Sequence, residues 1–315
     1  MPTPNGSPEV APLRTDLTEI TVVGADRTGI VAGVTGLLFE RGVNIEDIEQ
    51  TVRDGVFRMT LHCDTDPVES REALRDELAE TGDDLDVDIR TRFPDERDEG
   101  IAVLVTKEDH CLRALCEADL SADVRVVIGN HSGLESVAEE YGVPFHDVGD
   151  GSGVPDEDRL LELLDEYDVD VVVLARYMRI LSPDVVFRYP GRIINVHPSL
   201  LPAFPGAQAY RQAVEAGVRV AGVTAHYVTT DLDQGPILTQ RAFDLPPDAS
   251  VEDVKARGQP LEADALVTAV RAHLAGDVTV QRGSVQVTGD HQFGMPDAAS
   301  EANPERPLDV EPVDD

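Results

Sequence analysis

Apolar and polar positions divide the chain into two units with different hydrophobic periods. In the first unit, 17–92, short alternating stretches are separated by two helical ones. Gly42 closes the first helical stretch as a C-terminal cap would, and Asp54-Gly55 favours a tight hairpin. The predicted order is strand, helix, strand, strand, helix, strand, over residues 17–23, 30–41, 43–53, 56–63, 70–81 and 85–92. This βαββαβ order is typical of a ferredoxin-like domain.

The second unit, 101–289, contains continuous apolar runs instead of alternating ones. Such runs predict strands buried on both faces of a parallel sheet, at Ile101–Val105, Val124–Ile128 and Val169–Leu174. Helical patterns separate them, at 110–118, 134–141 and 156–166. We therefore expect an open, Rossmann-like α/β domain with a mostly parallel sheet. In such domains ligands bind beyond the carboxyl ends of the strands.

Three further segments complete the predicted organisation. Residues 1–16 form a polar lead that we expect to be flexible, and the charged stretch 93–100 links the two units. From 290 to 315 the chain is rich in proline and acids, which predicts a disordered acidic tail. The chain contains no apolar run long enough to cross a membrane, and 1–16 is unlike a secretory signal. We therefore expect a cytoplasmic protein with no membrane partner.

The charge is strongly acidic and spread along the chain. Asp and Glu total 61 against 26 Lys and Arg, giving a formal net charge of −35, which disfavours a nucleic-acid-binding surface. Lys107 and Lys255 are the only lysines. A dispersed acidic surface with few lysines resembles halophilic proteins of a high-salt cytoplasm, where charge repulsion is screened. An ordinary acidic protein is the alternative.

The cysteines predict neither a disulfide framework nor a metal site. Cys63, Cys111 and Cys116 are an odd and sparse set. His110 lies beside the last two, but the spacing matches no zinc motif, so we expect buried apolar thiols and no metal.

Candidate chemistry follows a strand that ends at His197. Asn195 and His197 are two residues apart, so both point to one side of a strand. An amide donor beside an imidazole suits acyl-group chemistry, in which one group binds an oxyanion and the other exchanges protons. A capping Asn beside a packed His is the alternative. Asp233 lies in a loop before the strand 237–240 and could orient an imidazolium or a water, or simply stabilise a turn.

The stretch 192–240 closely resembles the signature of folate-dependent formyltransferases. Asn195, His197 and Asp233 match that family's catalytic trio, and Leu174–Ser182 resembles its folate-binding strand end, whose main chain reads the pterin ring. The loop 228–233 resembles the opposite, pterin-side loop. The folate-binding residues implied by this resemblance are Met178, Arg179, Ile180, Leu181, Val228, Thr229 and Thr230.

Two segments resemble one branch of this family, the formyltetrahydrofolate deformylases. Thr106–Leu112 stands where glycinamide ribonucleotide formyltransferases have a glycine- and serine-rich phosphate loop, and its Glu108-Asp109 pair is a poor phosphate cradle. Asp26–Val31 and Gly42–Ile45 resemble an ACT domain, which deformylases carry at this position. The resemblance implies hydrolysis of 10-formyltetrahydrofolate, with folate as substrate and no cofactor.

Other members and roles remain open. Pro198–Pro202 has the transferase form, so a phosphoribosylglycinamide formyltransferase is the alternative. Methionyl-tRNA formyltransferase is disfavoured by the acidic charge, and a non-catalytic folate or amino-acid sensor by retention of the trio. The ACT resemblance implies an amino-acid effector near Gly29 and Asn44, although the domain could serve only to dimerise the chain. Its strand edges favour pairing, so we expect a homo-oligomer.

Overall fold

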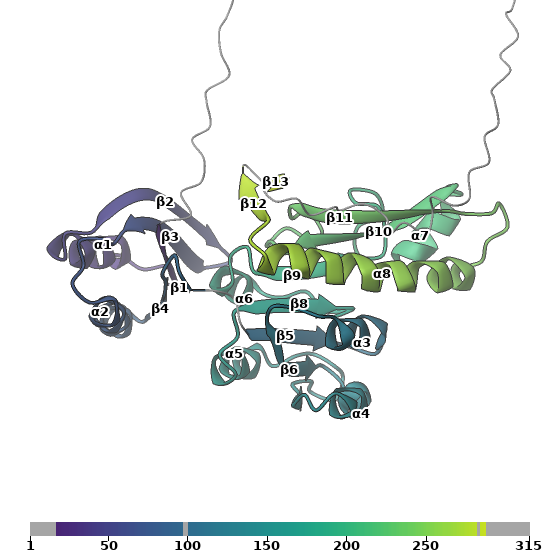
Figure 1. The fold of residues 1–315 in the computed structure, drawn as a ribbon, viewed down its shortest axis with the longest axis horizontal. Helices are drawn as coiled ribbons and strands as arrows, with labels where there is room; N and C mark the ends of the chain where they lie inside the picture. Colours follow the sequence, from purple (N-terminus) through teal and green to yellow (C-terminus); the bar gives the residue numbers. More distant parts are fainter. Residues whose placement is uncertain (1–16, 97–99, 282–283, 288–315) are drawn as a thin grey trace, which may run out of the picture.

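The computed structural model describes residues 17–96, 100–281 and 284–287 of the 315-residue chain. The predicted lead, 1–16, and tail, 290–315, lie outside the described residues, as do 97–99 of the predicted linker. The rest forms two large sheets, one in each predicted unit, and a short C-terminal hairpin (Figure 1).

The N-terminal unit has the predicted βαββαβ order. Its elements are β1 (Thr18–Ala25), α1 (Ile30–Glu40), β2 (Asn44–Arg53), β3 (Val56–Asp64), α2 (Arg71–Leu85) and β4 (Val87–Arg92). The strands pair antiparallel in the order β2-β3-β1-β4, and α1 and α2 pack on one face of the sheet (Figure 1). Ile20, Leu38 and Met59 are fully buried between the helices and the sheet. The Asp54-Gly55 hairpin is confirmed, with both residues at positive φ.

In the N-terminal unit, one boundary differs from the prediction by more than two residues. Helix α2 continues to Leu85, four residues past the predicted end, and Asp86 then takes a left-handed conformation with φ 56°. The last strand consequently begins at Val87 instead of at 85. Leu85 packs against the α1 glycine Gly33, so a tertiary contact extends the helix beyond its local signal.

The second unit is built on a seven-stranded sheet. Its strands are β5 (Gly100–Val105), β6 (Asp123–Gly129), β7 (Phe145–Asp147), β8 (Val171–Ala175), β9 (Ile193–His197), β10 (Val220–Tyr227) and β11 (Ile237–Asp244). In the order β11-β10-β9-β8-β5-β6-β7, the five strands from β9 to β7 are parallel, and β10 is antiparallel to both neighbours. The mostly parallel Rossmann-like sheet is therefore confirmed.

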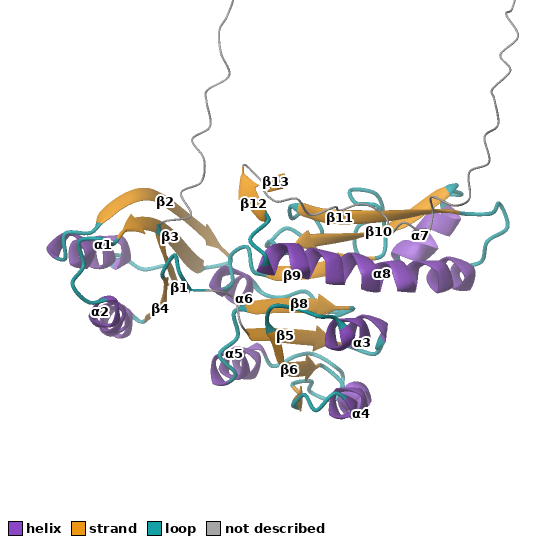
Figure 2. Cartoon of the chain, in the orientation of Figure 1, coloured by secondary structure: helices purple, strands orange, loops and turns teal. Residues whose placement is uncertain are grey.

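Helices cover both faces of this sheet (Figure 2). They are α3 (His110–Glu117), α4 (Glu135–Glu140), α5 (Glu157–Glu166), α6 (Pro183–Arg188), α7 (Ala209–Glu215) and α8 (Val251–Leu274). Residues of α3, α4 and α8 share one core with the sheet, and those of α5 and α6 share the core on the opposite face. The central strand β5 contributes to both cores, because Val103 faces one and Leu104 the other. A short hairpin, β12 (Val278–Gln281) and β13 (Ser284–Val287), follows α8.

The two units are in direct contact through α6. The Arg58 guanidinium on β3 lies 5.4 Å from the centre of the Phe187 ring on α6, and Arg188 of α6 lies 3.6 Å from the Asp88 carboxylate on β4. The ends of the predicted linker are themselves packed. Phe93 is buried in the N-terminal core, and Gly100 already belongs to β5.

The structure also bears on the membrane and cysteine predictions. Among the described helices, none has both the length and the apolar character needed to cross a bilayer. Cys63 and Cys111 are buried as expected, whereas Cys116 is half-buried, and all three are free thiols. Burial raises the pKa of the Cys63 thiol to about 12, which keeps it protonated and inert.

Candidate active site

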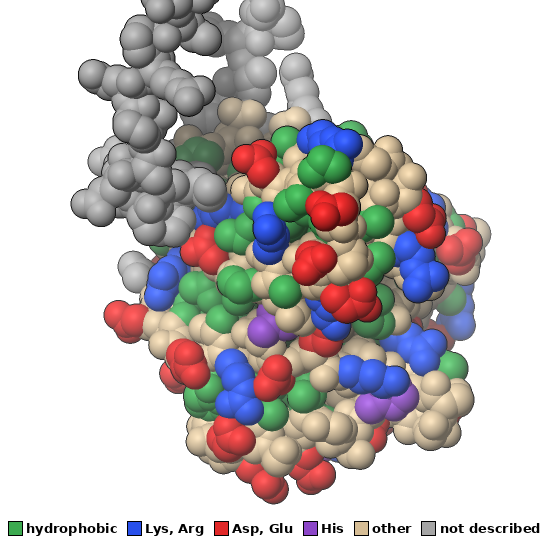
Figure 3. All heavy atoms as spheres, turned by 90° about the vertical axis from the view of Figure 1, so that its right-hand side faces the viewer, with side chains coloured by type: hydrophobic (Ala, Val, Ile, Leu, Met, Phe, Trp, Pro, Cys, Tyr) green, Lys and Arg blue, Asp and Glu red, His purple; other side chains and the backbone are tan. Residues whose placement is uncertain are grey.

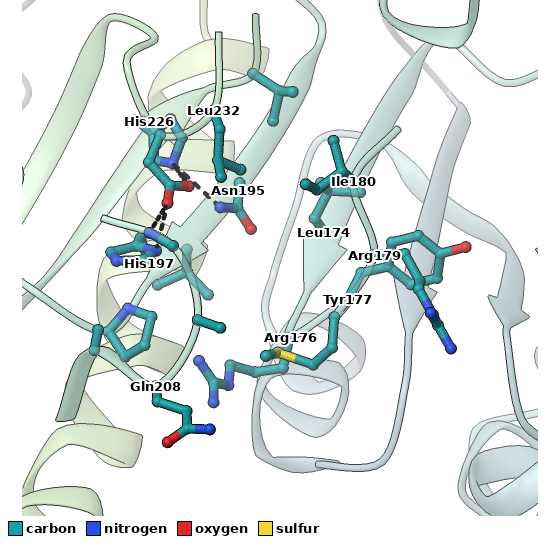
Figure 4. A pocket seen from close by; sticks show the side chains of 18 of the residues that line it. Leu174, Arg176, Tyr177, Arg179, Ile180, Asn195, His197, Gln208, His226 and Leu232 are labelled. Atoms are coloured by element: carbon teal, nitrogen blue, oxygen red, sulfur yellow. Dashed lines mark hydrogen bonds and ion pairs between the residues drawn. The ribbon is translucent and has the colours of Figure 1, made fainter. Parts of the chain in front are cut away.

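A cavity of about 540 Å³ opens beyond the carboxyl ends of β8 and β9, where an open α/β sheet is expected to bind its ligand. One wall is the segment that follows β8, and the opposite wall comes from the ends of β9 and β10 and the loop after β10 (Figure 4). The start of α7 and the first turns of α8 complete the lining. All ten predicted catalytic and folate-binding residues line this cavity.

Asn195 is held by a partner on the neighbouring strand. Its amide nitrogen Nδ2 lies 3.1 Å from Nε2 of His226, the residue directly opposite Asn195 in the β9–β10 pairing. The other ring nitrogen, Nδ1, lies 2.8 Å from the Tyr227 carbonyl, which can only accept, so Nδ1 carries the proton. Nε2 of the neutral ring therefore accepts from Asn195.

Burial keeps the His226 ring neutral. It lowers the pKa of His226 below its ordinary value of 6.5, although the Tyr227 carbonyl and Asp233 act in the opposite direction. The hydrogen bond fixes one N–H of Asn195 and leaves its second N–H to face the cavity (Figure 4).

His197 is anchored through one nitrogen and faces a carboxylate with the other. Its Nε2 donates to the Phe204 carbonyl at 2.9 Å, and its Nδ1 lies 3.4 Å from Asp233 Oδ2. A separation of 3.4 Å is too long for a strong hydrogen bond, so Nδ1 is the nitrogen that can exchange a proton with a ligand. The ring itself is 5% exposed, which leaves it open only toward the cavity.

Asp233 reaches His197 from the loop between β10 and β11. Its backbone is left-handed, with φ 53°, a conformation that Asp tolerates better than most residues. Oδ2 accepts the Gly206 N–H at 2.6 Å, and Oδ1 lies 4.0 Å from His226 Nε2. The Gly206 N–H therefore helps to hold the Asp233 carboxylate in place.

The segment after β9 connects the two catalytic candidates. Its Phe204 carbonyl receives His197, and its Gly206 N–H reaches Asp233. Thr224 of β10 fixes the start of this segment, because its hydroxyl donates to the Ser199 carbonyl at 2.7 Å and accepts the Leu201 N–H at 3.0 Å. The trio's geometry is thus set by backbone groups as well as by side chains.

The predicted folate-binding residues form an apolar part of the cavity. Met178 and Ile180 are 54% and 71% exposed, and Leu232 on the facing loop is 48% exposed. Large apolar side chains left exposed around a concavity mark a ligand site. The Met178 N–H donates to the Thr106 hydroxyl at 2.9 Å, which fixes the main chain of this wall against the end of β5.

A charged cluster lies at another part of the same cavity. Arg176 Nε lies 3.0 Å from a Glu108 oxygen and 3.2 Å from a Glu262 oxygen, and Lys255 Nζ lies 2.5 Å from the second Glu108 oxygen. Burial would raise the pKa of Glu108, but the hydrogen bond from Lys255 and the charge of Arg176 outweigh it and lower that pKa. In Figure 4, Arg176 and Gln208 lie on the side of His197 away from Leu232.

The fully buried Glu262 carboxylate belongs to a group of side chains whose spacing resembles that of a metal site. His110, Cys111 and Glu262 place their ligand atoms within 4.8 Å of one another. However, Arg176 and His110 contact the same Glu262 oxygen, at 3.2 and 3.1 Å, and Tyr210 donates to the other. A guanidinium in that position repels a metal cation, so an ion-pair network accounts for the cluster.

The two regulatory candidates lie in the N-terminal unit, away from the residues that line the cavity. Gly29 precedes α1 with φ 100°, and Asn44 begins β2, where its amide donates to the Glu46 carboxylate at 2.8 Å. Their role in binding an effector stays a prediction.

The sequence analysis assigned no catalytic or binding role to His226, which lies within β10. The structure places its ring in the cavity, bonded to Asn195 and near Asp233. Nothing local in the sequence marks this role, because it depends on the register between β9 and β10.

Two family models match the chain, a formyl transferase model over residues 99–270 and an ACT domain model over 19–92. The fold and site therefore define an ACT-containing protein of the formyl transferase class. The chain is 38% identical to the formyltetrahydrofolate deformylase of Bacillus subtilis (strain 168), over 83% of this chain and 90% of the relative. It is 35% identical to that of Escherichia coli (strain K12), over 81% and 92%. The chain belongs to the formyltetrahydrofolate deformylase family.

Solved structures agree with this assignment. A deformylase crystal structure from Pseudomonas syringae pv. tomato superposes with a TM-score of 0.59 at 30% identity, covering 87% of this chain and 94% of that one. A phosphoribosylglycinamide formyltransferase from Anaplasma phagocytophilum has the same TM-score, 0.59, at 33% identity, but covers only 62% of this chain while 98% of its own is matched. The transferase match therefore covers a smaller part of this chain than the deformylase match does.

Proposed function

We propose that this protein hydrolyses 10-formyltetrahydrofolate to formate and tetrahydrofolate. Family membership over both units supports the reaction. The observation that carries the proposal is the convergence of Asn195, His197 and Asp233 at one cavity whose other wall is apolar and open. The pterin would lie between the segment 178–181 and the loop 228–233, as the resemblance implies.

Asn195 supplies the electrophilic assistance in this proposal. Its free N–H donates to the formyl oxygen, and this hydrogen bond strengthens as negative charge develops on that oxygen. The hydrogen bond to His226 keeps the Asn195 amide in the required rotamer. Water adds to the formyl carbon and forms a tetrahedral intermediate.

His197 and Asp233 handle the protons. Asp233 Oδ1, the oxygen not bonded to Gly206, accepts a proton from the attacking water. Asp233 passes this proton to His197 Nδ1, 3.4 Å from its carboxylate, and Nδ1 gives it to the departing folate nitrogen as the carbon–nitrogen bond breaks, which returns both residues to their starting states. The products are formate and tetrahydrofolate, so the atoms of one water are fully accounted for.

Phosphoribosylglycinamide formyltransferase activity is the second candidate. The Pro198–Pro202 run favours it. An amine instead of water would then add to the formyl carbon, and the tetrahedral intermediate would release the folate nitrogen and leave the formyl group on the amine. The ACT unit and the acidic segment after β5 favour the hydrolase.

The test is to follow formate and tetrahydrofolate together in a mixture that holds only the protein and 10-formyltetrahydrofolate. A hydrolase releases both in equal amounts with no added amine. A transferase releases no formate, and it releases tetrahydrofolate only when its amine acceptor is supplied. An inert folate sensor releases neither in either case.

We also propose four further properties of the protein, which accompany this function. They are a cytoplasmic location, a supply of formate to one-carbon and purine metabolism, an amino-acid effector at the ACT unit and a homo-oligomer. The net charge of −35 supports halophilic conditions and the absence of a nucleic-acid partner. On the face in Figure 3, acidic and basic side chains are interspersed without a basic patch.

A further inference from the structure

The cavity has space for more than a pterin. The apolar part lies beside Ile180 and Leu232, and the carbon that reacts must sit against Asn195 and His197. Beyond them the cavity continues toward Arg176, Gln208 and the other charged side chains (Figure 4). That remaining part is where a second reactant would approach the formyl group.

Its charges cancel. Two cations, Arg176 and Lys255, face two carboxylates, Glu108 and Glu262. Glu108 is the bridge between the cations, because one oxygen contacts Arg176 and the other contacts Lys255. Each cation is thus already paired within the chain.

Glu262 prevents Arg176 from turning toward a ligand. It is fully buried on α8 and holds Arg176 from the protein side, while Tyr210 and His110 also bond to its carboxylate. Burial and then Glu262 raise the pKa of Tyr210, so this hydroxyl stays protonated and donates. The guanidinium is therefore fixed in place.

The phosphoribosylglycinamide formyltransferases share this fold and are named for an acceptor that carries a phosphate group. A phosphate carries close to two negative charges at neutral pH and needs unpaired donors or cations. A cluster whose cations and carboxylates are already bonded to one another offers neither.

We propose that Glu108 is a specificity-determining residue, which pairs with Arg176 and Lys255 and thereby closes the acceptor end of the cavity to phosphate-bearing amines, leaving water as the acceptor. This inference rests on the proposed function, and it predicts that an anion site is present but masked. Removing the charge of Glu108 takes away the ion-pair partner of Lys255 and leaves the cluster with one unbalanced positive charge, because Glu262 still pairs with Arg176.

The experiment measures binding of inorganic phosphate by titration calorimetry to the full chain saturated with tetrahydrofolate, at fixed ionic strength. Four proteins are compared: wild type, Glu108→Gln, the double variant Glu108→Gln/Lys255→Gln and Asp109→Asn. Asp109 is the matched control, because it is adjacent, has the same charge and pairs with Arg113 outside the cavity. Formate release from 10-formyltetrahydrofolate by the wild type is measured in parallel.

We expect Glu108→Gln to bind phosphate at least about tenfold more tightly than wild type, since the cluster then carries one unbalanced positive charge, which attracts a dianion in a partly desolvated site. The double variant should lose most of this gain, and Asp109→Asn should match wild type. Phosphoribosylglycinamide should then slow formate release by Glu108→Gln and not by wild type.

Equal phosphate affinity of Glu108→Gln and wild type would overturn the proposal. An equal gain in Asp109→Asn would also overturn it, by showing a general charge effect. Phosphate that binds Glu108→Gln only when tetrahydrofolate is absent would assign the cations to the folate's own carboxylates instead. Absence of formate release by wild type counts against the proposed function alone, because the phosphate titration is read independently.

Discussion

The Asn195 amide donates to Nε2 of His226 across the β9–β10 pairing, at 3.1 Å. In the proposed function, this bond leaves a single Asn195 N–H to face the formyl oxygen. Replacing His226 by Leu removes the acceptor, so the amide can rotate away from its productive orientation. We expect turnover to fall by about tenfold to a hundredfold, since small misplacements of catalytic groups have effects of that size.

The measurement is the steady-state kinetics of formate release by His226→Leu. The KM for the folate should change little, because the pterin walls are untouched. His226→Gln keeps a side-chain acceptor and should recover part of the loss. A Leu variant with unchanged turnover would show that Asn195 needs no support from β10.

The stability contributed by His226 should depend on pH with a defined sign. Burial lowers the pKa of His226 in the folded protein below the ordinary value of 6.5 that applies to the unfolded chain. Below pH 6.5 the unfolded chain binds this proton first, so folding stability is complete above that pH and is lost as the pH falls toward the folded pKa.

Urea unfolding of wild type and His226→Gln at several pH values isolates this effect, because the many carboxylates contribute equally to both proteins. The stability of wild type relative to the variant should decrease on acidification below neutrality. A difference that stays constant with pH would mean that His226 is already protonated or freely solvated in the folded state.

Asp233→Asn should impair chemistry and spare binding. Asn retains an oxygen that can accept the Gly206 N–H and tolerates the left-handed backbone, so the loop keeps its shape. The variant lacks the charge that faces His197 and the base for water. We expect turnover to fall on the order of a hundred- to a thousandfold, measured beside the tetrahydrofolate dissociation constant.

Asp244→Asn is the matched control for this variant. It makes the same chemical change at an exposed residue that does not line the cavity, and it should retain wild-type turnover. If Asp233→Asn kept its turnover, Asp233 would be a loop residue and a sensor role would regain support.

An ion pair joins the N-terminal sheet to the folate-side loop. Arg53, at the end of β2, lies 2.8 Å from Asp231, two residues before Asp233. Both side chains are about half exposed, so the pair is weak and screened by salt. Arg53→Ala should raise the KM for the folate by less than about fivefold at low salt.

Kinetics of the same variant in molar salt provide the control for that pair. There the difference from wild type should vanish, because screening removes the ion pair in both proteins. A KM effect that persists in high salt would show that Arg53 positions the loop by packing instead of by charge.

Glu262 should matter more to stability than any exposed carboxylate. Glu262→Ala strands the buried Arg176 without its inner partner and opens a cavity beside Tyr210. Breaking a buried pair in this way typically costs about 3–5 kcal/mol of unfolding free energy. Urea denaturation measures it, and a loss below about 1 kcal/mol would show that water or Glu108 replaces the missing carboxylate.

The parts of the fold that could be predicted are those that short stretches of sequence determine. The Asp54-Gly55 hairpin and the buried β5 run follow from turn chemistry and continuous apolar sequence, and both are found in the structure. Helix α8 was not predicted, because Gly258 and Pro260 interrupt its pattern. A capping box at Ser250 and packing on the sheet sustain it nonetheless.

The site was only partly accessible from sequence. Asn195 and His197 lie on one strand, so the two-residue period of a strand predicts that both side chains point to the same side. Their proximity to Asp233 could be predicted only from the family resemblance, because it depends on β10 lying antiparallel beside β9. The contact of His226 with Asn195 depends on the same register, as no local pattern encodes it.

The most direct test of the central claim is a reaction of wild-type protein with 10-formyltetrahydrofolate in ¹⁸O-labelled water, with saturating phosphoribosylglycinamide present. The account predicts formate that carries one ¹⁸O atom, released with an equal amount of tetrahydrofolate and at the same rate as without the ribonucleotide. Formyl groups transferred to the ribonucleotide, with no labelled formate, would contradict it.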